Sequence, residues 1–245
     1  MSARMATHRA VCERLVQLPS TVKSSNTFAS ELIYNIPMLT VVIQAGGMSA
    51  RMGEDKALKP FLGRPLIQRV VERLSPIADE LIVTTNRPAD YEFLGLRLVS
   101  DLKPGRGALG GLYTAIVSAT SPLVAVVACD MPFASPMFFE GARSLIVNEE
   151  ADVVIARVTS EAERGEKAGQ GYEPIHALYR RETCLPAIES AIDADQWKVI
   201  SWFSKVKVRT LTPEEVKSFD PSGLCFWNLN TPEEFAEAEK RASEQ

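Results

Sequence analysis

The sequence has few cysteines, few histidines and no long apolar run, and each shortage excludes a class of protein. Its 245 residues include four scattered cysteines, with no C-x-x-C pair, and only two histidines. This distribution argues against a zinc site and suits reduced, buried or incidental thiols, so we expect a cytoplasmic protein. No apolar run approaches the length that a membrane-spanning helix needs.

A strong excess of charge is also absent. The chain carries 27 Lys and Arg against 31 Asp and Glu, which gives a formal net charge of −4. We therefore expect no general binding to nucleic acid or to a membrane surface. A phosphate-bearing ligand would have to depend on local cations. The hydrophobic content of 46% is enough for a core, and the length suits one domain with or without an appendage.

The most informative stretch is a strand that breaks into a glycine turn. The β-branched run Val41–Ile43 predicts a buried parallel strand. Gly46 and Gly47 follow, and their N–H groups can approach a ligand closely because no Cβ intervenes. Arg51 and Lys56 come shortly after. A glycine turn leaving a strand, with two cations close behind, is typical of a phosphate-binding loop.

The spacing of this loop matches neither of two common phosphate-binding motifs. Five residues separate Gly47 from Gly53, and Glu54 stands where Walker A needs lysine. The Rossmann fingerprint fails as well, because Met48 and Arg51 occupy its second and third glycine positions. The plain alternative is a strand-to-loop turn whose Arg and Lys are merely solvated.

The same loop resembles the signature of the molybdenum cofactor guanylyltransferases, within the wider sugar-nucleotide-type nucleotidyltransferases. The family loop reads Leu-Ala-Gly-Gly-x-Ser-x-Arg-Met-Gly-x-Asp-Lys-Ala-Leu. The chain matches it at Ala45–Gly47, Ser49, Arg51–Gly53 and Asp55–Leu58. Gln44 stands where the family usually has leucine, at the nucleobase end of the loop. The Asp-Lys pair favours this branch over the cytidylyltransferase relatives, whose loops usually begin Ala-Ala-Gly.

Polar residues follow the next two predicted strands. The predicted strand Leu81–Thr85 is followed by Asn86. The predicted strand Leu96–Val99 is followed, one residue later, by Asp101. The resemblance implies that Asn86 lies at the nucleotide site, and we interpret Asp101 as an acceptor for ribose or base. Each residue also has a plainer interpretation, because Asn forms turns and Asp forms turns or helix caps. A second glycine-rich loop, Pro104–Gly111, then opens a helix.

The most hydrophobic predicted strand, Pro122–Asp130, ends in a carboxylate. Burying an unpaired carboxylate is costly, and a divalent metal would offset that cost. Mg²⁺ prefers one or two carboxylates together with substrate phosphates and waters, so we expect Asp130 to hold Mg²⁺. The alternative is an aspartate that caps the helix starting near Pro136. The family motif Cys-Asp-x-Pro-Phe/Tyr matches Cys129–Phe133.

The last predicted helix begins in another family motif, Asn-x-Asn-Thr-Pro-Glu-Glu, which spans Asn228–Glu234. A cap at Asn230 or Thr231, followed by proline and acids, explains the helix start. It does not explain Asn228, which we place in the active-site crevice. We assign Asn228 and Asn230 to the acceptor side. Cys225–Trp227, just upstream, is typical of a last strand.

His176 lies in Glu173–Tyr179, which resembles the acceptor-side stretch of the family. A general base is not needed there, because a phosphate nucleophile is already ionised near neutral pH. We therefore expect His176 to be a structural residue on a strand.

The alternation of strands and helices predicts an α/β layered domain with a mostly parallel sheet. The resemblance covers about residues 38–242 and implies a three-layer, Rossmann-like nucleotidyltransferase fold with one antiparallel strand. We expect this domain to span residues 38–245. Residues 1–37 are expected to be a poorly ordered extension, with a targeting presequence as the alternative. The strand-end loops that would then share one face lie near Gly46, Asn86, Asp101, Asp130 and Asn228.

The activity that the resemblance implies is transfer of GMP from GTP to the phosphate of a molybdenum-bearing molybdopterin, with release of pyrophosphate. Transient contact with molybdoenzymes or cofactor-synthesis proteins would follow. The expected catalytic residues are Arg51, Lys56 and Asp130, with Mg²⁺ on Asp130. The expected nucleotide-binding residues are Ala45, Gly46, Gly47, Lys56, Asn86, Asp101 and Asp130.

Two other functions stay open on the sequence alone. One is a cytidylyl- or other nucleotidyltransferase that acts on a different phosphate. The other is a catalytically silent nucleotide-binding subunit, although a scaffold would need none of Arg51, Lys56 and Asp130.

Overall fold

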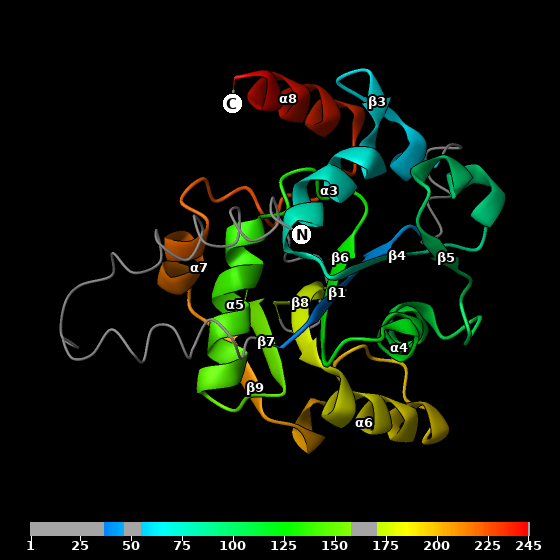
Figure 1. The fold of residues 1–245 in the computed structure, drawn as a ribbon, viewed down its shortest axis with the longest axis vertical. Coiled ribbons are helices and arrows are strands. Elements are labelled where there is room, and N and C mark those ends of the chain that lie inside the picture. The colour runs from blue at the N-terminus through cyan, green and yellow to red at the C-terminus, as the bar shows by residue number, and fades with distance from the viewer. Residues whose placement is uncertain (1–36, 47–54, 158–170, 245) are drawn as a thin grey trace. The chain divides into compact units, whose positions relative to one another are not determined.

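The computed structural model describes residues 37–46, 55–157 and 171–244 (Figure 1). The chain divides into two units, Met1–Pro37 and Met38–Gln245, and the account below concerns the second. Gly47 and Arg51, and all but the last residue of the expected extension, lie outside the described residues. Within the described ranges, no helix is both long enough and apolar enough to cross a membrane.

A seven-stranded sheet, counted over the described residues, has the order β5-β4-β1-β6-β8-β7-β9. The strand β8 is antiparallel to both of its neighbours, and the other neighbouring pairs are parallel. The prediction of a mostly parallel sheet with one antiparallel strand is therefore confirmed. The strands are β1 (Leu39–Gln44), β4 (Glu80–Thr84), β5 (Arg97–Val99), β6 (Leu123–Ala128), β7 (Val153–Arg157), β8 (Tyr172–Arg180) and β9 (Val208–Leu211).

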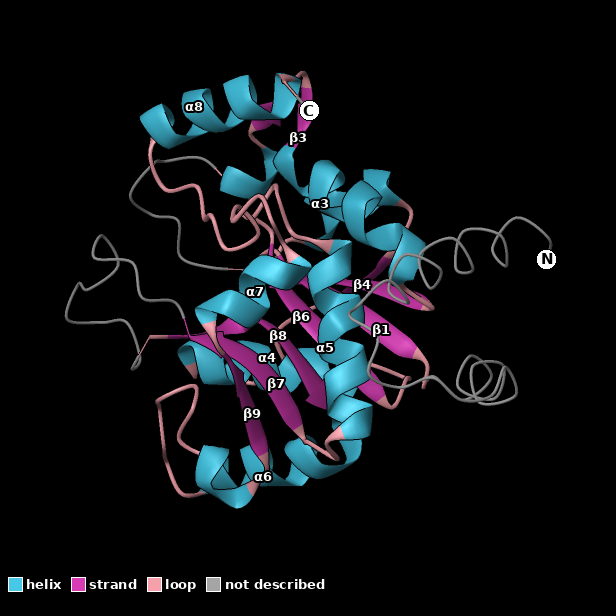
Figure 2. Ribbon diagram, turned by 90° about the vertical axis from the view of Figure 1, so that its left-hand side faces the viewer, coloured by secondary structure: helices cyan, strands magenta, loops and turns pink. Residues whose placement is uncertain are grey.

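Helices cover both faces of the sheet and make a three-layer arrangement (Figures 1 and 2). Side chains alternate between the two faces along β1. Val41 and Ile43 pack in a first core cluster, on one face, with residues of α3 and α5. Val42 packs in a second core cluster, on the opposite face, with residues of α4 and α6. These helices are α3 (Leu66–Leu74), α4 (Gly107–Ser118), α5 (Pro136–Asn148) and α6 (Arg181–Asp193).

A smaller lobe is built from a short hairpin and the C-terminal helix. The hairpin pairs β2 (Pro60–Phe61) with β3 (Arg64–Pro65), and its Phe61 packs in a third core cluster with Phe235 of α8 (Pro232–Ser243). Thr231 and Glu234 cap α8 reciprocally, which decides between the two caps that the sequence allows, Asn230 and Thr231. The remaining described elements are α7 (Pro213–Phe219) and the 3₁₀ helices η1 (Lys56–Leu58), η2 (Ser75–Ile77), η3 (Pro88–Leu94) and η5 (Phe203–Lys205).

The strand predicted at Cys225–Trp227 is wrong, because this segment forms a turn. The amide of Cys225 donates to Asp220 Oδ2 at 2.8 Å, and the amide of Trp227 donates to the carbonyl of Leu224 at 2.9 Å. These donors are therefore committed to local acceptors and not to a sheet ladder. Cys225 is fully buried, so the apolar character of the segment reflects a buried loop.

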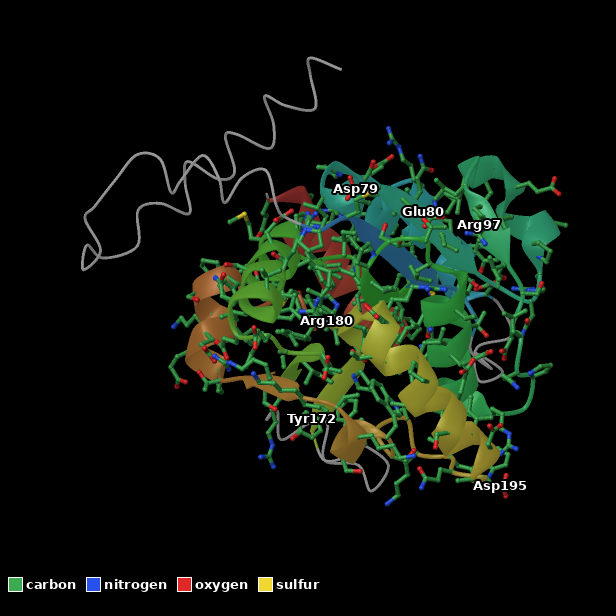
Figure 3. The ribbon with its side chains drawn as sticks, turned by 60° about the horizontal axis from the view of Figure 1, so that its bottom comes forward. Asp79, Glu80, Arg97, Tyr172, Arg180 and Asp195 are labelled. Carbon is green, nitrogen blue, oxygen red and sulfur yellow. The ribbon has the colours of Figure 1, made fainter. Side chains whose placement is uncertain are left out.

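Glu80 joins several strands at the end of the sheet where β1 and β4 begin, and Figure 3 shows it close to Asp79 and Arg97. Its carboxylate accepts from the hydroxyls of Thr40 at 2.8 Å and Thr120 at 2.7 Å, and from Arg97 Nη1 at 3.1 Å. Desolvation by burial opposes ionisation, but these hydrogen bonds prevail and lower the pKa of Glu80.

We expect Glu80→Gln to lower the free energy of unfolding at pH 7 by about 1.5–3 kcal/mol, the range for hydrogen bonds to a charged group. The folded-state pKa is depressed, so this stability is present above the pKa of the unfolded chain. It is lost as the pH falls through the folded-state pKa. Urea unfolding of both proteins at pH 7 and pH 4 measures the difference.

The matched control is Glu92→Gln, on the exposed surface of η3, which should change stability little at either pH. Two outcomes would contradict a stabilising role for the ionised Glu80 carboxylate. One is an equal loss of unfolding free energy in both variants, and the other is a loss in Glu80→Gln that is as large at pH 4 as at pH 7.

Candidate functional site

A cleft of about 1100 Å³ opens where the parallel strands end. It is lined by the segments that follow β1, β4, β5 and β6, by the first turn of α4, by the start of β8 and by the loop before α8. Parallel strands bring their carboxyl ends to one edge, which explains why segments distant in sequence meet here. The expected site residues in the lining are Ala45, Gly46, Lys56, Asn86, Asp101, Asp130 and Asn228.

Gly46 lies at the wall of the cleft just after β1. The amide of Ala45 donates to the carbonyl of Thr84 at 2.8 Å, which fixes the turn. A Cβ placed on Gly46 would lie 3.9 Å from that same carbonyl oxygen, an ordinary contact. The described neighbours therefore leave room for alanine, and a demand for glycine would come from a ligand that approaches the backbone.

Asp55 is a residue of this region that the expected site set omits. Its carboxylate caps η1 by accepting from the amide of Ala57 at 3.1 Å, and it also accepts from Tyr91 Oη at 2.5 Å and from Arg87. Burial and the hydrogen bond to Asp55 raise the pKa of Tyr91. The network fixes η1, which presents Lys56 to the cleft. The Asp-Lys pair of the motif is the sequence signal that marks Asp55.

Asn86 and Asp101 hold the loop between β5 and α4. Asn86 Oδ1 accepts from the amide of Asp101 at 3.0 Å. Asp101 Oδ1 accepts from the amide of Lys103 at 2.9 Å and from the hydroxyl of Thr114 at 3.0 Å. The bond to Lys103 is the local turn that the plainer interpretation of Asp101 predicted. Both residues thus have a structural task, and both line the cleft.

Asp130 follows β6, and its Oδ1 atom is buried with no hydrogen-bond partner among the described residues. Desolvation by burial raises the pKa of this carboxyl, whereas nearby Lys56 acts to lower it. The alternative role as a cap of the helix near Pro136 is wrong. Ser135 caps α5 instead, accepting from the amide of Phe138 at 3.3 Å.

The loop before α8 is attached directly to Asp130. The amide of Leu229 donates to the carbonyl of Asp130 at 3.0 Å. Asn230 Oδ1 accepts from Lys56 Nζ at 2.9 Å, so this loop also holds the cation at the cleft. Asn228 Oδ1, like Asp130 Oδ1, is buried without a partner among the described residues. Two such oxygen atoms are the kind of donor that Mg²⁺ prefers.

His176 is fully buried on β8, packed against Phe138, Phe139 and Phe226. Burial lowers its pKa to about 3, so the imidazole is neutral near pH 7. Its Nδ1 atom lies 3.2 Å from the sulfur of Met131. The expectation that His176 is structural is confirmed by this packing.

Other lining residues were not among the expected site residues. Glu173 was noted only as the start of the stretch that resembles the acceptor side of the family. Gln44 carried a signal, because it departs from the leucine of the resembled motif. No sequence pattern marked Arg87 as a lining residue, because its partner Asp55 is 32 residues away along the chain.

Comparison with known proteins gives consistent matches over most of the chain. The family described as a MobA-like NTP transferase domain matches residues 41–208. The chain is 30% identical over 211 residues to a probable molybdenum cofactor guanylyltransferase of Peptoclostridium acidaminophilum, covering 84% of this chain and 90% of that one. It is 35% identical over 200 residues to a probable molybdenum cofactor guanylyltransferase of Pelotomaculum thermopropionicum, and the match covers 81% of this chain and 91% of that one.

Among solved structures, the chain is similar to molybdopterin-guanine dinucleotide biosynthesis protein A from Archaeoglobus fulgidus. The TM-score is 0.69 at 24% identity, and the match covers 84% of this chain and all of that one. At this identity the likeness shows the fold alone.

We expect Asp130→Asn to raise the melting temperature at pH 7 in the absence of divalent cations and nucleotide. An acid whose folded-state pKa is raised stabilises the folded state only while it is protonated, and ionisation at higher pH costs stability. The neutral amide avoids that cost. Because the acid is protonated in both states below its unfolded pKa of about 3.9, the gain should vanish there. A lower melting temperature for the variant at pH 7 would contradict this account.

Proposed function

The chain belongs to the molybdenum cofactor guanylyltransferase family of MobA-like nucleotidyltransferases, and from this membership we propose that it transfers GMP from GTP to the phosphate of molybdenum-bearing molybdopterin. Pyrophosphate is the leaving group. The reaction rests on positioning and on stabilising negative charge, because phosphoryl chemistry needs little covalent help from the protein.

One observation carries this proposal. A cation on Lys56, an acid on Asp130 and the glycine backbone at Gly46 line a single cleft at the carboxyl ends of the strands. The residues come from three separate segments, so local sequence effects do not explain the convergence. A triphosphate needs this combination of cation, close backbone approach and metal-holding acid.

In the proposed reaction an oxygen of the acceptor phosphate forms a bond to the α-phosphorus of GTP. The bond from the α-phosphorus to the oxygen bridging to the β-phosphorus breaks, and its electron pair leaves with pyrophosphate. Lys56 Nζ, already oriented by Asn230, neutralises charge on the triphosphate and on the leaving group. Arg51 is proposed to neutralise charge in the same way, and the amide of Gly47 is proposed to hold the nucleotide; both lie outside the described residues.

The donor atoms present suit Mg²⁺. Asp130 would hold the ion, and Asn228 is the nearest further candidate, because both offer a buried oxygen without a partner among the described residues. When bound, Mg²⁺ supplies electrostatic stabilisation of phosphate oxygens. The amide of Leu229 donates to the carbonyl of Asp130 and holds the Asn228 segment against it.

The remaining site residues divide between the two substrates. Ala45, Asn86 and Asp101 are proposed to contact the nucleotide, and Asn228 and Asn230 to lie toward the acceptor. The proposal includes transient contact with molybdoenzymes or cofactor-synthesis proteins, which would receive or deliver the cofactor.

The proposal is tested by pyrophosphate release with GTP, Mg²⁺ and molybdenum-molybdopterin. We expect Asp130→Ala to reduce turnover on the order of 10²- to 10³-fold, the scale for removing a key electrostatic group. CTP and ATP in place of GTP are the controls for the nucleotide. Release with CTP alone would favour a cytidylyltransferase, and no release with any nucleotide would favour a silent binding subunit.

We expect Lys56→Ala to raise the KM for GTP by roughly 10- to 100-fold, since charge-assisted hydrogen bonds are worth about 1.5–3 kcal/mol. Steady-state kinetics at varied GTP measures this effect. Lys198→Ala is the matched control, because Lys198 is exposed and lies outside the cleft lining. Unchanged GTP binding and rate in Lys56→Ala would refute the role of this cation.

A further inference from the structure

The loop between β5 and α4 forms one wall of the cleft, with Asp101, Gly105 and Gly107 in the lining. Its first end is fixed from within, because Asn86 Oδ1 accepts from the amide of Asp101. Its second end carries the two glycines, which adopt positive φ values of 83° and 57°. Glycine restricts the backbone less than any other residue, so this end needs an anchor of its own to keep one conformation.

Arg106 stands between the two glycines and contacts residues outside the described lining of the cleft. Its guanidinium pairs with the carboxylate of Asp195, 89 residues further along the chain. Its guanidinium carbon also lies 5.0 Å from the ring centroid of Trp197. Both partners follow α6, which packs with α4 in the second core cluster. One side chain therefore connects the wall of the cleft to the end of α6.

Asp195 has an unusual backbone conformation for an aspartate, with a positive φ of 53°, and Figure 3 shows it at the end of α6. The amide of Gln196 donates to the carbonyl of Ala191 at 2.9 Å, and the amide of Asp195 donates to the carbonyl of Ile192 at 3.0 Å. These two bonds define the left-handed position after a helix, which glycine usually fills without strain. What aspartate adds at this position is a carboxylate, and that carboxylate pairs with Arg106.

The ion pair is too exposed to contribute much to the stability of the whole domain. The side chain of Asp195 is 75% exposed, and ion pairs at such exposure are weak. Its effect is instead local, since it restricts the loop that carries Gly105 and Gly107. Contact with the indole ring of Trp197 restricts the guanidinium further.

We propose that the ion pair between Arg106 and Asp195 holds the glycine wall of the cleft in the conformation that binds the nucleotide. Both are then positioning residues, and neither is proposed to touch GTP. The proposal rests on the proposed function and deepens it. A loop that is already ordered binds its ligand without the conformational cost of being ordered in that step. Breaking the ion pair transfers this cost to the binding of GTP.

The test compares wild type with Asp195→Gly by calorimetric titration with GTP in Mg²⁺ and by thermal unfolding without ligand. Glycine removes the carboxylate and also relieves the positive φ. We expect GTP to bind on the order of 10-fold more weakly, the cost of ordering about one residue. The melting temperature should equal that of wild type or exceed it, because the strain is gone. A merely structural aspartate would not separate the two readouts in this way.

Glu150→Gly is the matched control, because Glu150 ends α5 in the same manner. It has a positive φ of 50°, and the amide of Ala151 donates to the carbonyl of Ile146 at 3.2 Å. Its side chain is exposed and lies outside the described lining of the cleft. Glycine should therefore relieve the same strain and leave the affinity for GTP unchanged.

A double-mutant cycle tests whether Arg106 and Asp195 act through each other. Asparagine tolerates the left-handed conformation and keeps the size of aspartate without its charge, so Asp195→Asn isolates the ion pair. Asp195→Asn and Arg106→Gln should each weaken GTP binding, and the double variant should lose no more than the larger single loss. Amide hydrogen exchange over residues 101–112 should be faster in each ligand-free variant than in wild type.

Each outcome decides the proposal. Weaker GTP binding in Asp195→Gly, with an undiminished melting temperature, losses that are not additive and faster exchange, supports it. Unchanged GTP affinity, additive losses, unchanged exchange, an equal loss of affinity in Glu150→Gly or a lowered melting temperature overturns it. The proposed function is untouched by those results, provided that wild type binds GTP. A wild-type chain that does not bind GTP overturns the proposed function, and this proposal with it.

Discussion

The parallel pairing of β1 with both β4 and β6 is the constraint on which the rest of the structure depends. Its register places Gln44 opposite Thr84 and Ala128, so the three strands end at the same level. The chain leaves β1 toward β4 and β5 on one side and later returns to β6 on the other. The loops that follow therefore diverge, and a cleft opens between them, as expected at a point where strand order reverses.

Buried polar groups with and without partners occur at both ends of this sheet, and Ser121 Oγ and Arg181 Nε are atoms without a described partner near its amino end. At the amino end, Glu80 has hydrogen bonds from three partners and a lowered pKa. At the carboxyl end, the buried atoms without a partner among the described residues include Gln44 Nε2, Asp130 Oδ1 and Asn228 Oδ1. Each unpaired group reduces stability, so the core and the groups that have partners must offset the cost. Binding energy from a charged, polar ligand would recover that cost.

The protein's own hydrogen bonds organise the cleft. Asp55 fixes η1, Asn86 fixes the loop that carries Asp101, and Leu229 joins the last loop to the carbonyl of Asp130. Each of these hydrogen bonds involves a backbone group. The first is local, within the cap of η1, and the other two join separate segments. Such a preformed arrangement lowers the conformational cost of ordering a ligand and suits a reaction that depends on position and charge.

The sequence by itself determined the strands β1, β4, β5 and β6, the capped start of α8, the mostly parallel character of the sheet and the residues at the ends of these strands, because these follow from local periodicity, capping chemistry and a motif. It mistook the buried turn at Cys225 for a strand, since burial and strand pairing leave the same apolar pattern. Only the tertiary structure decided that Lys56 bonds Asn230, 174 residues away, and that Gln44 faces α4. Contacts between distant segments depend on how the layers pack, and no local pattern encodes that packing.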